Sequence, residues 1–567
     1  MNKRWAIRDV QAIDEIKTLA AELNIDPVLS TLLIQRGVKS FEQARYFFRP
    51  DERHLHDPFL MQDMEKAVGR IEAAIAAGEK IMIYGDYDVD GTTAVALVYS
   101  FFKNHHGNIE YYIPDRYKEG YGISTQGIDY AAAAGFNLII ALDCGIKSVD
   151  KIAYANGLGI DFIICDHHTP GDELPDAIAV LDPKRKDCGY PFKELSGCGI
   201  GFKLAQAYAE KNGLPFEDVA RYYDLVAVSV ACDIVPIVGE NRVLAYFGLQ
   251  KLNADPCIGL KTLMGVAGKN ISYTISDIVF LLGPRINAAG RIDDAKHAVE
   301  LLISCDEDAA QTKGELINIH NTERKGHDLQ ITDEALSMIG ENQVLIDRKS
   351  TVVFNEHWHK GVIGIVASRL TEKYYRPTVV LTRSNGHVAG SARSVLGYDL
   401  YEALCGCSDL LIQFGGHKYA AGLTMQPENV EAFINKFEEV VSSTITTEQL
   451  TQQIQIDAEL RLDQIEAKFF RILNQFAPFG PENMAPVFIT KNVYVCGTPA
   501  LVGQNHIKMT VMQPGSAMFD CIAFGQGEQL LQIKKDKPFD ICYAIEENVW
   551  RNKRSIQLNI KGIKIQK

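Results

Sequence analysis

Short apolar runs alternate with amphipathic segments between residues 81 and 185 of the chain. Five apolar runs have the length and the branched or aromatic side chains of buried strands: IMIYGD, IEYYIPD, LIIALDCG, FIICDHH and AIAVLDP. Helix-like segments such as TAVALVYSFFKNH and SVDKIAYANG lie between most of these runs. This alternation predicts an α/β fold with a mostly parallel sheet and helices on both of its faces.

The pattern changes on both sides of this region. Apolar positions recur three and four residues apart before residue 50 and from about residue 246 to 345, which predicts helices, including one long connecting helix over GELINIHNTERKGHDLQITDEALSMI. A second α/β unit is expected next, then a polar linker near residues 442–451, and finally short strands that predict a small antiparallel barrel. We therefore expect five segments, at residues 1–60, 61–245, 246–345, 346–445 and 452–567.

Composition narrows the class of protein only in part. No apolar run in the 567 residues reaches the roughly 18 residues of a membrane span, and the first residues lack the apolar core of a signal peptide. The twelve cysteines include no C-x-x-C pair and fit a reducing compartment, so we expect a cytoplasmic protein. The net charge of −14 argues against a nucleic-acid partner. However, part of the negative charge could belong to metal-binding carboxylates, and a local basic groove could still bind nucleic acid, so the charge does not decide the question.

Three carboxylates, Asp86, Asp88 and Asp90, directly follow the first apolar run. Carboxylates this close together repel one another unless a cation lies among them, and hard divalent cations such as Mg²⁺ and Mn²⁺ prefer oxygen ligands. One alternative is a solvated acidic loop. A Ca²⁺-binding loop is disfavoured because its last position requires a bidentate Glu, and Leu97 occupies that position here.

Further metal-ligand types stand at the ends of other elements. Asp143 follows LIIAL, and Asp166, His167 and His168 follow FIIC. Asp233 ends the nearly all-apolar helix DLVAVSVAC, where a buried charge needs a partner. A single Asp after a strand is often only a cap or turn residue, but three strands that each end in such residues predict a site.

Glycines mark another candidate phosphate-binding segment. Gly197, Gly199 and Gly201 open a predicted helix, where they allow either a close approach to a phosphate or close helix packing. The dinucleotide fingerprint G-x-G-x-x-G does not follow the first strand, which argues against a nicotinamide enzyme.

The motifs DYDVDG, LDCG, CDHH and CDIVP together resemble the DHH phosphoesterase superfamily and, within it, the RecJ family of single-strand-specific exonucleases. The resemblance runs from about residue 80 to 295, and LLGPRINAAGR is typical of RecJ. It implies a DHH-type parallel-sheet catalytic domain, a long connecting helix, a second α/β DHH-associated domain and a C-terminal OB-type β-barrel.

The same resemblance implies two divalent ions, Mn²⁺ or Mg²⁺, bridged by Asp143. Asp86 and Asp88 would complete the ligands of one ion, and Asp90, His167 and Asp233 those of the other. His168 would face the scissile phosphate as an electrostatic or acid–base group, so Asp143 and His168 are the candidate catalytic residues.

Candidate substrate-binding residues lie in three further places. Within the RecJ-like core, the expected residues are Arg116, Arg285, Asn287 and Arg291, although a turn with salt bridges is the alternative for GPRINAAGR. In the second α/β unit, Ser391 and Arg393 in a glycine-bounded turn, with Gly415, Gly416 and His417, resemble a pocket for a 5′-terminal phosphate; an ordinary turn is the alternative. The run from Trp550 to Arg554 has the aromatic and basic side chains of a strand-binding surface or of a plain hairpin tip.

The resemblance implies a metal-dependent exonuclease that digests single-stranded DNA from the 5′ end and releases 5′-mononucleotides during DNA repair and recombination. It implies single-stranded DNA as the partner, a single-strand-binding protein and a repair helicase as protein partners, no membrane association and a monomeric chain. One rival is a phosphodiesterase of the same superfamily that acts on short oligonucleotides or cyclic dinucleotides. Another is a non-catalytic scaffold that binds single strands.

Overall fold

The computed structural model describes residues 3–9, 11–269, 271–550 and 553–565, without the side chain of Trp550. The chain forms two compact units. The larger unit comprises Ala6–Gly290, Asp294–Asn318 and Gln455–Lys567. The smaller unit comprises Met1–Trp5, Arg291–Asp293 and Ile319–Ile454. The five-segment division expected from the sequence remains a prediction.

A five-stranded parallel sheet is the centre of the larger unit. Its order is β3-β2-β4-β5-β6, with β2 Ile81–Gly85, β3 Ile109–Tyr112, β4 Leu138–Leu142, β5 Asp161–Cys165 and β6 Ala179–Leu181. All five predicted strands are confirmed. The chain runs outward from β2 to β3 and then returns past β2 to β4, so the strand order reverses between β2 and β4. In open α/β sheets, ligands bind beyond the carboxyl ends of the strands at such a point.

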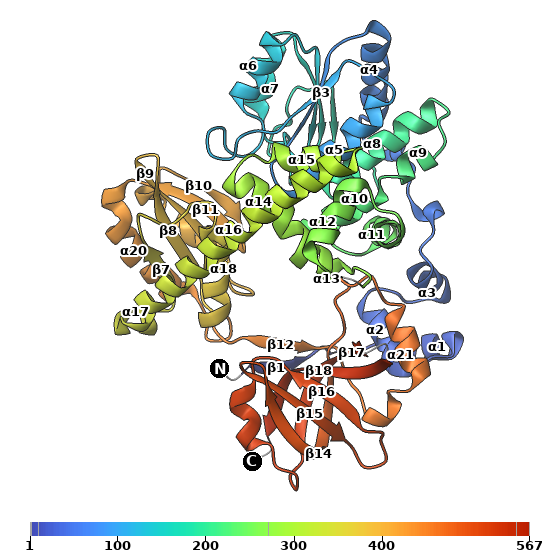
Figure 1. Cartoon of the computed structure of the whole chain (residues 1–567), viewed down its shortest axis with the longest axis vertical. Coiled ribbons are helices and arrows are strands. Elements are labelled where there is room, and N and C mark those ends of the chain that lie inside the picture. The colour runs from blue at the N-terminus through green and yellow to red at the C-terminus, as the bar shows by residue number, and fades with distance from the viewer. Residues whose placement is uncertain (1–2, 10, 270, 551–552, 566–567) are drawn as a thin grey trace. The chain divides into compact units, whose positions relative to one another are not determined.

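Helices cover both faces of this sheet, as Figure 1 shows. Ile83 and Ile140 share one apolar core with the helices α4 (Met64–Ala77), α5 (Val89–Lys103) and α8 (Gly197–Lys211). Met82 and Ile139 point to the opposite core, which includes α6 (Thr125–Ala133) and α7 (Val149–Gly157). Because successive strand residues enter different cores, the strands are apolar throughout rather than alternating.

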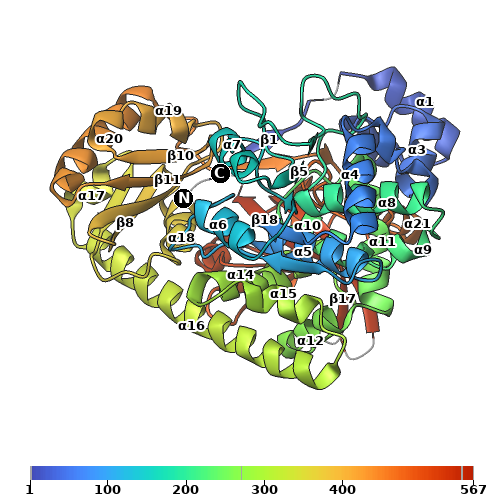
Figure 2. The same ribbon diagram turned by 90° about the horizontal axis from the view of Figure 1, so that it is seen from above.

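Helices dominate the chain after the sheet. Their bounds are α9 Glu217–Ala220, α10 Tyr223–Cys232, α11 Gly239–Ala254, α12 Ile258–Ala267, α13 Ile275–Asp277, α14 Gly283–Ile292 and α15 Lys296–Leu302. The 34-residue α16, Glu307–Gly340, is the predicted long helix and is drawn in yellow-green in Figure 2; the short α17, Gln343–Asp347, follows it. The segment GPRINAAGR forms α14, so the alternative of a turn is wrong.

A closed barrel forms the C-terminal part of the larger unit. Its sheet has the order β13-β14-β15-β16-β18-β17, and β14 also pairs with β17. The strand bounds are β13 Ala458–Glu459, β14 Phe488–Val502, β15 His506–Met512, β16 Phe519–Ala523, β17 Phe539–Trp550 and β18 Lys553–Ile565. The expected OB-type barrel is confirmed, and its pairings are antiparallel except for those of β16 with β18 and β13 with β14, which are parallel. The additional antiparallel pairing of β14 with β17 closes the sheet into the barrel.

The N-terminal helices pack against this barrel. Leu29 and Leu33 share a core with Phe469 and Phe488. The helices that surround the core are α1 Ile13–Leu23, α2 Pro27–Gln35, α3 Phe41–Phe48 and α21 Ala467–Asn474. The first described residues add a strand, β1 (Arg4–Ile7), which pairs with β12 (Gln453–Ile456). Segments at the two ends of the chain therefore complete one core.

The smaller unit is a second α/β structure. Its sheet order is β10-β11-β9-β8-β7, with β7 Thr351–Phe354, β8 Thr378–Ser384, β9 His387–Arg393, β10 Gln413–His417 and β11 Ala420–Met425. Helix α18 (Ile363–Tyr374) packs in one core, and α19 (Leu400–Cys405) and α20 (Val430–Thr444) pack in another. The expected linker begins late, because α20 continues to Thr444.

The expected turns in this unit are wrong. Ser391 and Arg393 lie in β9, and Gly415, Gly416 and His417 lie in β10, an exposed edge strand of the sheet. Glycine content favours turns, but the tertiary pairing of β10 with β11 overrides that local preference here.

Two further expectations concern the whole chain. No helix among the described residues has the length and apolar character needed to cross a membrane. The expected strand-binding run from Trp550 to Arg554 includes residues 551–552, which lie outside the described residues, as does the side chain of Trp550.

Candidate metal centre

The predicted ligands meet at the carboxyl edge of the parallel sheet in the larger unit. Asp86 follows β2, Asp143 follows β4 and His167 follows β5, so the three residues come from neighbouring strands. Asp233 reaches the same place from the end of α10. The residues lie at the reversal of strand order between β2 and β4, which is the place where open α/β sheets bind their ligands.

Asp86 and Asp88 occupy the loop between β2 and α5. Both carboxylate oxygens of the buried Asp86 lack a hydrogen-bond partner among the described residues. Asp88 caps α5, since its Oδ1 accepts hydrogen bonds from the backbone N–H groups of Asp90 at 2.9 Å and Gly91 at 3.1 Å. The cap fixes the Asp88 side chain and leaves its second oxygen for another partner.

Asp90 is held from a different direction. Its two oxygens accept hydrogen bonds from the backbone N–H groups of Gly197 at 2.6 Å and Cys198 at 2.8 Å, and from the Ser229 hydroxyl at 2.7 Å. The amides belong to the first turn of α8, where a carboxylate is favoured by the free N–H groups and the helix dipole. The N-terminus of α8 therefore orients a candidate ligand.

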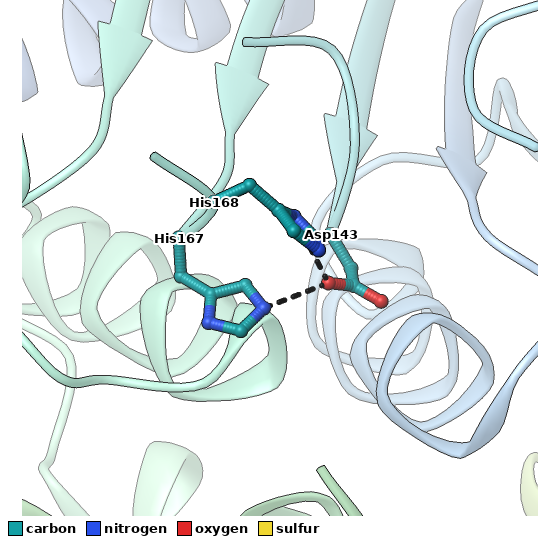
Figure 3. Close-up of side chains that lie close together, drawn as sticks. All are labelled: Asp143, His167 and His168. Carbon is teal, nitrogen blue, oxygen red and sulfur yellow. Dashed lines mark ion pairs between the residues drawn. The ribbon is translucent and has the colours of Figure 1, made fainter. Parts of the chain in front are cut away.

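Asp143 lies at the middle of the cluster. Its Oδ1 is 3.2 Å from His167 Nε2 and 4.0 Å from His168 Nδ1, as Figure 3 shows. Asp143 has a φ of 58°, in the left-handed region that non-glycine residues rarely adopt, and such strain is concentrated at functional sites. A Cβ on Gly197 would lie 2.6 Å from the Asp143 Cβ, so only glycine lets α8 approach Asp143 this closely. The glycine at the start of α8 thus serves close packing.

The two histidines have different surroundings. Neither ring nitrogen of His167 has a hydrogen-bond partner among the described residues, and its Nε2 is 3.7 Å from Asp90 Oδ2 and 3.5 Å from Asp233 Oδ2. Burial lowers the pKa of His167 although Asp90 opposes this, so the ring is neutral and can offer a lone pair to a metal.

Unlike His167, His168 has a polar neighbour at each ring nitrogen. Its Nδ1 donates a hydrogen bond to Asp166 Oδ1 at 2.7 Å, and its Nε2 lies 3.1 Å from the Tyr121 hydroxyl. Burial alone would lower the pKa of His168, but the hydrogen bond and charge of Asp166 raise it. The pKa values of the two histidines therefore shift in opposite directions, and the Asp166 carboxylate favours the protonated form of His168.

Ligand atoms of these residues form three groups, in each of which all the atoms lie within 4.8 Å of one another: Asp86, Asp88 and Asp143; Asp90, His167 and Asp233; Asp143, His167 and His168. The first two groups contain all six residues expected as metal ligands, and Asp143 also belongs to the third. Their assignment as ligands remains a prediction, as does the catalytic role of His168.

The electrostatics of the cluster favour the binding of positive charge. Burial and Asp88 raise the pKa of Asp86 well above that of an ordinary carboxyl group. Burial and neighbouring carboxylates, above all Asp90, also raise the pKa of Asp143. The same causes raise the pKa of Asp233 to about 9. Buried oxygens without partners, in a set of oxygen and imidazole donors, fit Mg²⁺ or Mn²⁺.

The structure also shows contacts to the cluster from residues that were not among the predicted metal ligands or catalytic residues. Asp166 accepts hydrogen bonds from the backbone N–H groups of Ile146 and His167 in addition to the His168 ring. Tyr121 contacts His168. Asp166 stands in the CDHH motif, so its position was visible, but the direction of its side chain depends on how β5 ends beside β4.

The candidate substrate-binding residues of the core lie in different environments. The Arg116 guanidinium stacks over the Tyr87 ring at 4.8 Å and is close enough to lower the pKa of Asp86 in opposition to burial. Arg285 is only 8% exposed and donates to the Leu281 carbonyl at 2.7 Å and to Asn318 at 3.1 Å. Asn287 is half-buried in α14. Arg116 thus lies at the metal centre, whereas Arg285 is engaged within the helices.

The remaining candidates belong to the smaller unit. Arg291 donates to the Gly361 carbonyl at 2.8 Å. Ser391, Gly422 and Gly415 lie side by side on β9, β11 and β10, and Arg393, Ala420 and His417 form the next such row. A Cβ on Gly364, in the first turn of α18, would lie 3.0 Å from Ser391 Oγ and 3.2 Å from Arg393 Nη2. The structure therefore brings Ser391, Arg393, Gly415 and His417 onto one face of the sheet, with Gly416 between the rows on β10.

Models of three protein families match the chain. They are described as DHH family, N-terminal domain, at residues 80–230; DHHA1 domain, at residues 347–443; and RecJ OB domain, at residues 456–562. The first match contains the sheet and its helices, the second contains the sheet of the smaller unit, and the third contains the barrel.

Curated proteins and solved structures agree with these matches. The chain is 38% identical to the single-stranded-DNA-specific exonuclease RecJ of Bacillus subtilis, over 98% of this chain and 70% of the relative. It is 32% identical to the protein of the same name from Escherichia coli, over 97% of this chain and 98% of the relative.

Two similar solved structures contain manganese. RecJ of Thermus thermophilus in complex with Mn²⁺ has a TM-score of 0.86 at 25% identity, with 100% of this chain and 80% of that chain covered. A structure described as exonuclease RecJ bound to manganese has a TM-score of 0.60 at 30% identity, with 68% of this chain and 96% of that chain covered.

Proposed function

Since the chain belongs to the family of single-stranded-DNA-specific RecJ exonucleases, we propose that it hydrolyses single-stranded DNA from the 5′ end and releases 5′-mononucleotides. We place this activity in DNA repair and recombination. The observation that carries the proposal is the convergence of five aspartates and His167 on one buried cluster whose ligand atoms lie close together. The proposed cofactors are two divalent ions, Mn²⁺ or Mg²⁺.

The residues of the cluster have separate tasks in this proposal. Asp86, Asp88 and Asp143 would hold one ion, and Asp90, His167, Asp233 and Asp143 would hold the other. Two such ions supply an activated water and stabilise charge on the attacking and leaving oxygens of a phosphodiester. The N-terminus of α8 and the strained backbone of Asp143 fix ligands before metal binds, which keeps the geometry pre-organised.

His168 would act on the substrate and not on a metal. Asp166 holds its Nδ1, which leaves Nε2 as the atom that faces the rim of the site, next to the Tyr121 hydroxyl. Asp166 raises the pKa of His168 and so favours the protonated ring, whose Nε2–H can bind a phosphate oxygen or give a proton to a leaving oxygen.

The face formed by β9, β10 and β11 in the smaller unit is the proposed site for the 5′-terminal phosphate. Ser391 and Arg393 offer a hydroxyl and a guanidinium, and Gly415 and Gly422 leave room for an anion to approach the backbone. Burial lowers the pKa of Arg393, so an anion would provide a favourable counter-charge. Arg116, Arg285, Asn287 and Arg291 remain proposed contacts to the strand.

We also propose two protein partners, a single-strand-binding protein and a repair helicase, and a monomeric state. These proposals rest on the sequence resemblance. Size-exclusion chromatography with light scattering would test the monomer directly. Pull-down with each purified partner class, in the presence of nuclease to remove bridging DNA, would test the protein contacts.

The decisive experiment is the substitution Asp143→Ala, which removes the residue shared by two ligand groups. We expect the variant to fold and to lose hydrolysis of a labelled, 5′-phosphorylated single strand in Mn²⁺ or Mg²⁺. Near-normal turnover by the variant would show that the cluster is not the catalytic centre.

The same assay separates the rivals. A dinucleotide hydrolysed much faster than a long single strand would favour the phosphodiesterase of short oligonucleotides. Strand binding without metal-dependent release of mononucleotides would favour the scaffold. Wild-type activity that survives chelation would contradict the metal mechanism itself.

A further inference from the structure

Ile234 combines two properties that protein stability disfavours. Its φ is 60°, in the left-handed region where a β-branched side chain is a genuine outlier. Its apolar side chain is also 66% exposed, so burial does not compensate for the strained backbone. Both properties occur in the residue directly after Asp233, whose Oδ2 lies 3.5 Å from His167 Nε2.

The fold explains the backbone conformation at this position but not the side chain. Helix α10 ends at Cys232, and a left-handed residue after the C-cap Asp233 turns the chain away. Left-handed residues also end α1, α4, α12 and α18, and none of these is β-branched: they are Asn24, Gly78, Gly268 and Tyr375. Among the described non-glycine residues with positive φ, only Ile234 is β-branched. Glycine would satisfy the turn with less strain, so the isoleucine side chain serves something other than folding.

The position of Ile234 indicates what that purpose is. Consecutive Cα atoms are about 3.8 Å apart, so the side chain starts next to a candidate metal ligand. The surrounding cluster consists of carboxylates and imidazoles, and Ile234 adds an exposed apolar surface beside them. A nucleotide whose phosphate reaches the cluster has apolar surface only on its sugar carbons and its base.

We propose that Ile234 is a positioning residue that packs against the sugar or base of the nucleotide whose phosphate enters the metal centre. This inference rests on the proposed exonuclease function and deepens it. The contact buries the isoleucine only when a strand is bound, so it contributes to strand affinity and alignment without contributing to the stability of the free protein.

The test compares Ile234→Gly, Ile234→Asn and Ile234→Val. Glycine and asparagine accept the left-handed backbone but remove the apolar contact, whereas valine keeps a branched aliphatic surface. We expect the Gly and Asn variants to melt at or above the wild-type temperature and to show a KM for a long single strand raised about ten-fold, the factor expected from one buried aliphatic side chain. The Val variant should restore most of the affinity.

Two controls separate this effect from others. Half-saturation by Mn²⁺ should stay unchanged, because an altered value would mean that the substitution had moved Asp233. Glu482→Gly relieves a left-handed backbone of φ 60° in an exposed turn elsewhere and should leave KM unchanged. A strand with an abasic reacting nucleotide identifies the contact: if the difference between wild type and Ile234→Gly disappears, the base is contacted, and if the difference persists, the sugar is contacted.

An unchanged KM in Ile234→Gly, with active wild type, would overturn the inference and leave the proposed function intact. A marked fall in melting temperature of the same variant would also overturn it, since Ile234 would then be a structural contact. Wild-type protein that binds strands but does not degrade them would refute the proposed function instead, and strand affinity measured in Ca²⁺ would still test the contact.

Discussion

Substitution of Gly197 by alanine adds a single methyl group and should disable the metal centre. In Gly197→Ala the new Cβ would lie 2.6 Å from Asp143 Cβ and 2.9 Å from Asp143 Cα. Unbonded carbon atoms prefer separations of about 3.5–4.0 Å, so the overlap is roughly 1 Å. The atoms met belong to the backbone and the first side-chain carbon of Asp143, which have no free rotation away from α8. The carboxylate must therefore move with them.

The expected loss follows from this displacement. A misplacement of about 1 Å in catalytic geometry lowers turnover by roughly 100-fold, and Asp143 is shared by two ligand groups. Stability should change much less, because overpacking costs about 1–3 kcal/mol while alanine favours helix α8 over glycine by up to about 1 kcal/mol. The Gly197 N–H that donates to Asp90 is retained by alanine. Turnover should thus fall far more than the melting temperature.

Steady-state hydrolysis of a 5′-labelled single strand, measured over a range of Mn²⁺ concentrations, checks this prediction. The matched control is Gly199→Ala in the same helix, whose Cβ would come no closer than 3.3 Å to a neighbouring atom, the Ser196 Oγ, and would not touch Asp143. A Gly197→Ala enzyme with turnover and Mn²⁺ half-saturation close to wild type would refute the argument. Equal losses in both variants would assign the effect to the helix and not to Asp143.

Three further predictions concern charge. Asp166→Asn should lower kcat by about 100-fold and shift the alkaline limb of the pH–rate profile downward, because His168 loses the carboxylate that raises its pKa; unchanged kinetics would contradict this. Arg393→Ala should raise KM about ten-fold for a 5′-phosphorylated strand but not for a 5′-hydroxyl strand. Because the pKa of Asp233 is raised to about 9, the folded metal-free protein keeps a proton that the unfolded chain releases near pH 4. Its stability should therefore decrease from about pH 4 to pH 9, by up to about 1.4 kcal/mol per pH unit. Melting curves with chelator and with Mn²⁺ test this, and the metal should remove most of the slope.

The parallel sheet and its ligand edge were predictable because they depend on local sequence. A strand buried on both faces is a continuous apolar run, and ligands at the ends of parallel strands must meet at one edge. Asp86, Asp143 and His167 each directly follow such a run, so their convergence required no knowledge of distant packing. Asp233 could be added because a carboxylate at the end of an apolar helix needs a partner.

Features that depend on contacts between distant segments were not predictable. The turn expected around Ser391 and Arg393 is a strand because β8 and β11 pair with it on both sides. Leu29 and Phe488 share a core although they lie far apart in the chain. The three glycines of α8 left phosphate binding and close packing equally open, and only the position of Gly197 against Asp143 decides between them.

The charge of the cluster argues for two cations over one. Asp86, Asp88, Asp90, Asp143 and Asp233 carry five negative charges when all are ionised. One divalent ion would leave three of these charges uncompensated in a largely buried site, whereas two leave one. The raised pKa values of Asp86, Asp143 and Asp233 have the same origin, because burial and the neighbouring carboxylates favour the protonated form of each group. Binding of the metal pair must then release protons, which links metal affinity to pH through the same carboxylates that hold the ions.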